Sequence, residues 1–292
     1  MAMRWLLFGG AILMTGCGSR GLAPPRPPQK EAAPPLTPDA RLSRGTTRLS
    51  QSRYAEAEAD LNAALSGSNV GAARLALSEL AWMTGRYPEA IAHAQAALAA
   101  GAEKPLVALA ESRALRASGE VEAALGRLRA LPLEGAPAEN RLLVGELLLE
   151  VGKRAEAEPI LLTIIEDYNE DRVLETDGAG MARVGRAAHL LRSPKDANDA
   201  FDQAEKAEPG RVRTLLYRAE LYLEKYDPGH AEEVLTEALQ LAPQHPQANM
   251  LLAEVRLAQA LDFDEAERLA RVALAQNPRL THAYYVLAGI AV

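Results

Sequence analysis

Residues 211–243, RVRTLLYRAELYLEKYDPGHAEEVLTEALQLAP, decide the fold of this chain. Apolar residues recur in both halves at the three- and four-residue steps that place side chains on one face of a helix. They are Leu215, Leu216, Ala219, Tyr222 and Leu223 in the first half and Ala231, Leu235, Ala238 and Leu239 in the second. Pro228 cannot continue the first helix because it lacks a backbone N–H, so a turn is expected at residues 227–229. The stretch therefore predicts a helical hairpin with one apolar side.

A single hairpin of this size cannot bury its apolar side, so neighbours of the same kind are required. Ala231 and the residues four, seven and twelve positions later form a cassette that recurs along the chain. The cassettes begin at Ala57, Ala90, Ala124, Ala157, Ala197, Ala231 and Ala266, with spacings of 33, 34, 33, 40, 34 and 35 residues. The last three end in a proline, at Pro209, Pro243 and Pro278.

This period of about 34 residues, with small residues where helices meet and a proline at the junction, is similar to the tetratricopeptide repeat. The most family-like pieces are GRYPEAIAHAQAAL (85–98), GEVEAALGRL (119–128), GKRAEAEPIL (152–161) and FDEAERLARVALAQNP (263–278). The resemblance implies an all-α, right-handed superhelical solenoid of about seven helix-turn-helix repeats over residues 39–279. Two departures are that the early aromatic residue is mostly Leu, Ala or Arg, and that the first four cassettes lack the proline.

The first 17 residues, MAMRWLLFGGAILMTGC, resemble a bacterial lipoprotein signal peptide. One basic residue, Arg4, precedes an apolar run that is too short for a membrane span, which needs about 20 apolar residues. Residues 14–17, MTGC, match the lipobox, with Met where Leu is the commoner choice. The resemblance implies that residues 1–16 are removed and that the Cys17 sulfur carries the lipid; an incidental cysteine is the alternative. Cys17 is the chain's single cysteine, so no intramolecular disulfide can form.

Residues 17–38 are expected to form the lipid anchor and a semi-rigid tether, since residues 18–38 contain seven prolines. Gly18 is not the aspartate associated with retention in the inner membrane, so the resemblance implies an anchor in the outer membrane, facing the periplasm. A basic run, Arg41, Arg44, Arg48 and Arg53, follows the tether. It is interpreted as the solvated edge of the first helix, with contact to anionic lipid as the alternative.

The 40-residue spacing between Ala157 and Ala197 predicts an insertion of about six residues within 166–178, EDYNEDRVLETDG. Its carboxylates do not follow the ligand spacing of an EF-hand, so a solvated acidic loop is favoured over a calcium site.

Residue patterns of catalysis are missing from the sequence. The histidines are His93, His189, His230, His245 and His282, and they form no zinc motif; no phosphate loop or nucleophile elbow occurs either. No cofactor and no metal are expected. Without residues 1–16 the chain has 31 basic and 39 acidic residues, a net charge of −8, which argues against nucleic acid as a partner.

In tetratricopeptide arrays the first helices of successive repeats line a concave face that holds peptides or partner helices. The family's groove-facing positions correspond here to Trp82, Arg113, Arg116, Glu146, Glu150, Arg186, Glu220, Glu224 and Glu254. Their charges run basic, acidic, basic and acidic, which suits a mixed-charge protein surface better than a free carboxylate terminus. Trp82 is the best single candidate for an anchor, because large aromatic residues dominate interface energies, but packing between repeats is slightly favoured as its role.

Residues 280–292, LTHAYYVLAGIAV, have the apolar stripe of a first helix, with Tyr284, Leu287 and Ala288 on it, but no second helix follows. Arrays usually end in a polar capping helix. A C-terminal interface is therefore expected at Tyr284, Leu287 and Val292, covered either by another subunit or by a continuation of a longer chain.

Two functional hypotheses follow. The first is a non-catalytic, lipid-anchored envelope scaffold that binds a protein or peptide in the groove and self-associates through the uncapped helix. The second is the N-terminal portion of a larger envelope enzyme, such as a metallopeptidase, with catalysis outside these residues.

Overall fold

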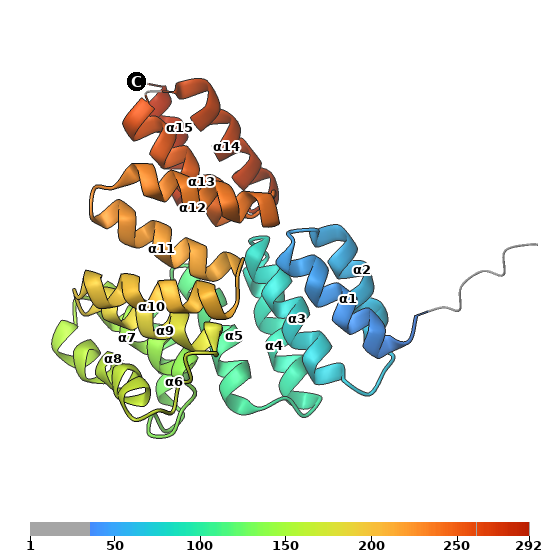
Figure 1. The fold of residues 1–292 in the computed structure, drawn as a ribbon. Coiled ribbons are helices and arrows are strands. Elements are labelled where there is room, and N and C mark those ends of the chain that lie inside the picture. The colour runs from blue at the N-terminus through green and yellow to red at the C-terminus, as the bar shows by residue number, and fades with distance from the viewer. Residues whose placement is uncertain (1–35, 261, 292) are drawn as a thin grey trace, which may run out of the picture. The chain divides into compact units, whose positions relative to one another are not determined.

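Fifteen α-helices and one π-helical segment make up the regular structure of residues 36–260 and 262–291, the part of the chain that the computed structural model describes (Figure 1). The first helices of the hairpins are α1 (Pro38–Ser50), α3 (Val70–Met83), α5 (Lys104–Ala117), α7 (Ala138–Glu150), α9 (Gly178–Leu190), α11 (Val212–Glu224) and α13 (Pro246–Val255). The second helices are α2 (Tyr54–Ala64), α4 (Tyr87–Ala99), α6 (Val121–Arg129), α8 (Arg154–Asn169), α10 (Pro194–Ala207), α12 (Pro228–Leu241) and α14 (Phe263–Gln276). The last helix, α15 (Thr281–Ile290), has no partner of its own.

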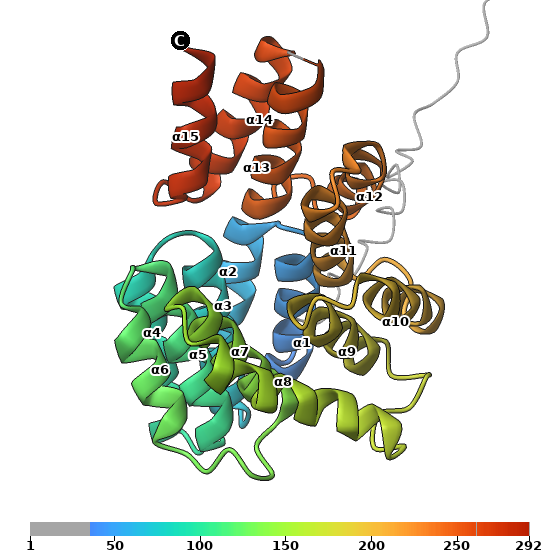
Figure 2. The same ribbon diagram turned by 90° about the vertical axis from the view of Figure 1, so that its left-hand side faces the viewer.

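Each first helix packs against the second helix that follows it, and the first helices also contact one another in sequence from α1 to α11. At the C-terminal end α13, α14 and α15 lie side by side in both views (Figures 1 and 2). Seven helical hairpins and one single helix confirm the predicted solenoid of about seven repeats. The signal peptide, Cys17 and the tether as far as Pro35 lie outside the described residues.

The alanines that begin the seven cassettes are all completely buried, as the repeat predicts. The residue four positions later is also buried in every repeat, from Leu61 in α2 to Ala270 in α14. One cassette position deviates: Leu131 follows the end of α6 at Arg129 and is only half-buried. The hydrophobic effect therefore acts through one periodic row of small and aliphatic side chains.

A second periodic row, of small residues, lies in the first helices opposite the cassettes. It was not expected from the sequence. Its members are Gly45, Ser78, Ser112, Gly145, Gly185, Ala219 and Ala253, and all are buried. A Cβ at Gly145 or Gly185 would overlap Leu161 or Phe201 of the following helix. The Ser78 and Ser112 hydroxyls instead donate to the carbonyl oxygens of the facing alanines, over 2.7 and 3.0 Å. Small residues on both sides let the two helices of a hairpin approach closely.

The π-helical segment, Arg256–Ala260, follows directly after α13. It explains why the last hairpin has one residue more than the other six between its two rows. The small residue of the first helix precedes the cassette alanine by 12 positions in the first six hairpins, and by 13 between Ala253 and Ala266. A π-helical turn holds one more residue than an α-helical turn. It therefore absorbs the additional residue and keeps both rows in register.

The connection within residues 211–243 differs from the sequence expectation. Pro228 is the first residue of α12 rather than part of the turn, and Gly229 lies inside that helix. Proline is favoured at the first helical position because its missing N–H has no partner there in any case. The turn itself consists of residues 225–227, with Tyr226 at a φ of 56°.

The insertion after α8 is also placed differently from the expectation. Instead of a loop over 166–178, α8 continues to Asn169 and only residues 170–177 connect it to α9. Asp167 lies in the helix, where Arg141 and Arg172 bind its carboxylate. Part of the insertion is therefore a helix extension held by ion pairs rather than a solvated loop.

The turn between α3 and α4 contacts the loop between α14 and α15, although the two are 190 residues apart. The Asn277 side chain donates to the Tyr87 hydroxyl over 3.5 Å, and the Arg279 guanidinium lies 5.8 Å from the Tyr87 ring centroid. Gly85, with a φ of 75°, lies directly against the Asn277 side chain, so a Cβ there would overlap its Oδ1 atom. The second repeat thus contacts the end of the array.

This contact predicts different effects for two glycines that hold equivalent turn positions. Gly85→Ala and Gly119→Ala both place a Cβ at a positive φ, which costs roughly 1–2 kcal/mol, but no atom lies within 4 Å of a Cβ at Gly119. Gly85→Ala must also displace Asn277, so we expect it to destabilise the chain by at least about 1 kcal/mol more. Urea unfolding of the two variants measures the difference; equal losses would contradict the contact.

Candidate functional site

The groove-facing residues expected from the sequence lie on the first helices, and the structure brings most of them together. Trp82 is on α3, Arg113 and Arg116 on α5, Glu146 and Glu150 on α7, Arg186 on α9, Glu220 and Glu224 on α11, and Glu254 on α13. We call the surface formed by these helices the inner face. Arg213 of α11 reaches both Glu139 of α7 and Glu79 of α3 across it, at 2.6 and 3.6 Å. Side chains from distant repeats can meet in this way only if the face is concave.

Four of the expected residues form a chain of ion pairs that crosses four repeats. The Arg116 guanidinium contacts Glu146 at 2.7 Å, Glu146 contacts Arg186 at 2.8 Å, and Arg186 contacts Glu220 at 2.8 Å. Glu150 joins at 2.9 Å from Arg116. We call these five residues the charge ladder. Its alternation of sign was predicted, but its side chains bind one another instead of facing outward unpaired.

The central members of the charge ladder are held in their charged forms. Burial acts to raise the pKa of Glu146, yet the guanidinium groups of Arg186 and Arg116 hold that pKa below its ordinary value. Burial acts to lower the pKa of Arg186, and the carboxylates of Glu146 and Glu220 raise it instead. Replacing one partner would leave an uncompensated charge in a partly buried site, which is the costly case for ion pairs.

A second cluster, centred on Glu139 of α7, had not been expected from the sequence. Its carboxylate binds Arg113 at 2.5 Å, Arg213 at 2.6 Å and Arg183 at 3.5 Å, from three different helices. We call it the arginine cluster. Glu139 lies in the first turn of α7, outside the groove-facing positions that the family resemblance indicated. The sequence pattern therefore did not mark it.

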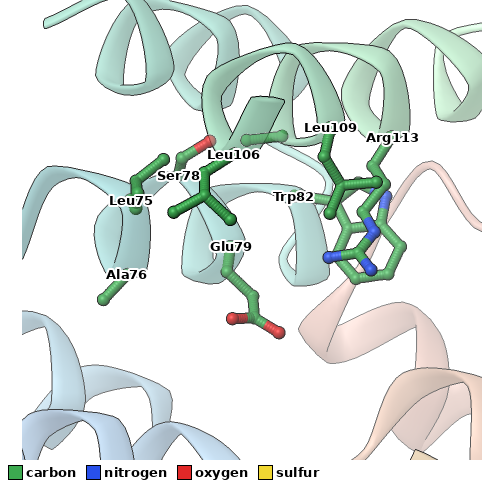
Figure 3. Close-up of a pocket in the computed structure, with 9 residues that line it drawn as sticks. Leu75, Ala76, Ser78, Glu79, Trp82, Leu106, Leu109 and Arg113 are labelled. Atoms are coloured by element: carbon green, nitrogen blue, oxygen red, sulfur yellow. The ribbon is translucent and has the colours of Figure 1, made fainter. Parts of the chain in front are cut away.

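A hollow of about 230 Å³ opens beside the arginine cluster, between α3 and α5 (Figure 3). Its walls are apolar at one end and charged at the other. The lining residues are Leu75, Ala76, Ser78, Glu79, Trp82, Leu106, Leu109, Ala110 and Arg113. Leu106, at the apolar end, leaves 43% of its surface exposed within the hollow. The hollow is therefore an accessible recess with an apolar wall.

Trp82 lies at the charged end of the hollow, and its role as a binding anchor stays a prediction. One part of the side chain packs against the buried core residues of α3 and α4. The Arg113 guanidinium lies over the ring, 5.8 Å from its centroid, as Figure 3 shows. Burial and the nearby Arg213 charge lower the pKa of Arg113. Packing and the lining of the inner face are thus both observed for Trp82.

The remaining expected residues are less closely involved. Glu224 binds His189 over 2.6 Å, and Glu254 is exposed at the far end of the inner face. On α15 the side chains that face the core are Ala283, Val286 and Leu287, whereas Tyr284 and Ala288 are exposed. Tyr284 and Ala288 are therefore uncovered within this chain, and the expected C-terminal interface stays a prediction. Val292 lies outside the described residues.

Three residues of the basic run after the tether bind a buried carboxylate. Arg44 and Arg48 each contact the Asp60 carboxylate at 2.6 Å, and Arg41 lies 3.7 Å from it. Asp60 is on α2 and only 2% exposed, so these guanidinium groups neutralise a buried charge. The side chains of Arg44 and Arg53 remain 42% and 49% exposed, so the run is a solvated edge that also holds the first hairpin together.

The described part of the chain contains neither a cluster of metal-ligating side chains nor a membrane-spanning helix. There, no three His, Cys, Asp or Glu side chains converge as they would around a metal ion. No helix of that part is both long enough and apolar enough to cross a bilayer.

Comparison with known proteins identifies the repeats. The tetratricopeptide-repeat model matches residues 42–105 and 185–246, which include α2 to α4 and α10 to α12. The chain contains tetratricopeptide repeats in both stretches. A search of curated proteins finds no match.

Solved structures agree with this family at the level of the fold. A tetratricopeptide-repeat protein from Parabacteroides merdae aligns with a TM-score of 0.53 and 16% identity, over 87% of this chain and 99% of its own. A thermophilic tetratricopeptide-repeat protein from Thermus thermophilus aligns with a TM-score of 0.40 and 19% identity, over 76% of this chain and 100% of its own. At 16% identity, the Parabacteroides merdae structure shows a shared fold alone. Proteins of this fold are typically non-catalytic interaction scaffolds that use the concave face.

The inner face contains one pH-sensitive group that can be tested. His245 caps α13, where its Nδ1 accepts from the Ala248 N–H over 3.3 Å. Burial lowers the pKa of His245 to about 4, and the Arg213 charge adds to the effect. The unfolded chain, with a pKa near 6.5, binds the proton first, so stability is complete above about pH 6.5 and falls as the pH drops towards 4.

We expect His245→Asn to remove up to about 3 kcal/mol of the stability loss between pH 6.5 and pH 4, because asparagine keeps the cap without titrating. Urea unfolding at the two pH values measures this loss. His282→Asn, on the exposed side of α15, is the matched control for the loss of one histidine. An identical pH dependence in both variants would refute the role of His245.

Proposed function

We propose that the protein is a non-catalytic scaffold whose inner face binds a protein or peptide partner. The observation that carries this proposal is the hollow between α3 and α5, because it is the place where apolar surface, Trp82 and charged groups meet on the inner face. Large aromatic residues and arginines in such recesses commonly dominate binding energy. The exposed Leu106 offers surface that a partner would remove from water.

The charge ladder supports a restricted binding region. Since its carboxylates and guanidinium groups already bind one another, a partner gains little by contacting them and would have to break existing pairs. The hollow lies at the N-terminal side of this ladder, on the second and third repeats. Binding is therefore centred there, with the ladder holding the first helices in a fixed arrangement.

The alternative is that these residues are a portion of a larger enzyme whose catalysis lies outside them. In the alternative, the same array would present a catalytic domain of a larger envelope protein.

The second part of the proposal is that a lipid on Cys17 anchors the scaffold to the outer membrane, facing the periplasm, with residues 18–38 as a spacer. The lipobox-like sequence supports it. At about 3.1 Å per residue, an extended spacer of this length reaches some tens of ångströms. It would give the inner face access to partners away from the membrane surface.

Site-specific crosslinking tests the binding proposal. A photoreactive phenylalanine analogue replaces Leu106 on α5 in the protein's own cells; the control replaces Leu98 on α4, which is 44% exposed but belongs to a second helix. We expect a discrete crosslinked species with the first and none with the second. Equal crosslinking at both positions, or none at Leu106, would rule out the inner face as the binding surface.

Detergent phase separation tests the anchor. Cys17→Ser removes the sulfur that accepts the lipid, so we expect the variant to leave the detergent phase while the unmodified protein stays in it. Ser19→Ala is the control for a change next to the cleavage site and should not alter partition into the detergent phase. Retention of the Cys17→Ser protein in the detergent phase would exclude lipidation at this residue.

A further inference from the structure

The lining and volume of the hollow between α3 and α5 indicate which kind of partner segment can bind there. This inference rests on the proposed function. Its apolar wall is formed by side chains of two neighbouring first helices, with Leu75 and Leu106 half-buried or exposed and Leu109 buried. A volume of about 230 Å³ exceeds that of a single water molecule several times. The space suits one aliphatic or aromatic side chain rather than a whole helix.

The other end of the hollow is defined by guanidinium groups. Arg113 lines the hollow directly, and Arg213 reaches the same place from α11. Both use one close carboxylate, that of Glu139, at 2.5 and 2.6 Å. The remaining carboxylate, Glu79, is 3.6 Å from Arg213 and its side chain is 46% exposed.

Two guanidinium groups that share one close carboxylate repel each other. The lowered pKa of Arg113, caused by burial and by the charge of Arg213, is consistent with this repulsion. A further carboxylate at this end would be attracted, since three guanidinium groups, those of Arg113, Arg183 and Arg213, surround the single carboxylate of Glu139. An ammonium or guanidinium group from a partner would meet two like charges instead.

We infer that the hollow binds a protein segment in which one apolar side chain, seated against Leu106 and Leu75, is followed or preceded within about four residues by an aspartate or glutamate that contacts Arg113 and Arg213. The acidic group is a side chain within the segment. Such a segment would match the hollow by charge complementarity at one end and by burial of an apolar side chain at the other. Neither the charge ladder nor α15 takes part.

The first step of the test selects peptides without assuming a partner. A phage library of random 12-residue peptides is panned on the full-length protein in detergent. We expect the enriched peptides to contain Leu, Ile, Met or Phe with Asp or Glu within about four positions. Enrichment of apolar peptides without acidic residues, of peptides rich in Lys or Arg, or of no peptides at all would overturn the inference.

The second step measures binding of the most enriched peptide, synthesised with blocked ends, through the fluorescence of Trp82. Leu106→Glu should weaken binding about tenfold or more, and Leu98→Glu, with equal exposure on α4, by less than about twofold. The blocked ends exclude capture of a terminal carboxylate. Equal effects of the two substitutions would place the peptide elsewhere.

The third step isolates the acidic contact. Arg213→Gln should weaken binding of the enriched peptide about three- to tenfold, yet hardly change binding of the same peptide with its acidic residue replaced by the amide. Arg271→Gln is the control, because this residue is exposed on α14 and paired with Glu267. Independent effects of the two changes would disprove the carboxylate contact.

The inference and the proposed function can fail separately. If Leu106 crosslinks to a partner in cells but the selected peptides lack the apolar and acidic pair, the scaffold stands and the partner chemistry is wrong. If Leu106 forms no crosslink, the proposed function itself fails.

Discussion

The close approach of the two helices in each hairpin is the constraint on which the rest of the structure depends. A small residue in the first helix faces a fully buried alanine in the second, seven times along the chain. In three hairpins the next cassette residue is large and glycine stands opposite it, as in the pairs Gly45–Leu61, Gly145–Leu161 and Gly185–Phe201. Close packing leaves no room for a different register, because protein interiors are as dense as organic crystals.

Maintaining that register explains the irregular features. The additional residue before Ala266 is absorbed by the π-helical segment, and the longer insertion after Ala157 extends α8 as well as the loop. In both cases the contact rows stay aligned while a connection changes. Insertions are thus accommodated where they do not separate the two small-residue rows.

The electrostatic arrangement of the inner face follows from the same stacking. Because equivalent positions of successive first helices lie next to one another, charges that alternate from repeat to repeat form pairs such as Arg116 with Glu146 and Arg186 with Glu220. Desolvation offsets much of the energy of such pairs, so they define the geometry of the face more than its stability. What remains open to a partner is the hollow at Trp82, where apolar surface is exposed.

The sequence by itself determined the all-helical repeat, its period, the buried cassette alanines and the helices that carry the candidate site. It could do so because burial repeats at fixed intervals within one hairpin. Only the tertiary structure showed that Arg213 reaches Glu139 and Glu79, that Asp60 binds the basic run, and that the second repeat contacts Asn277. These contacts depend on how strongly the array curves, and curvature accumulates from small rotations between repeats that no local pattern encodes.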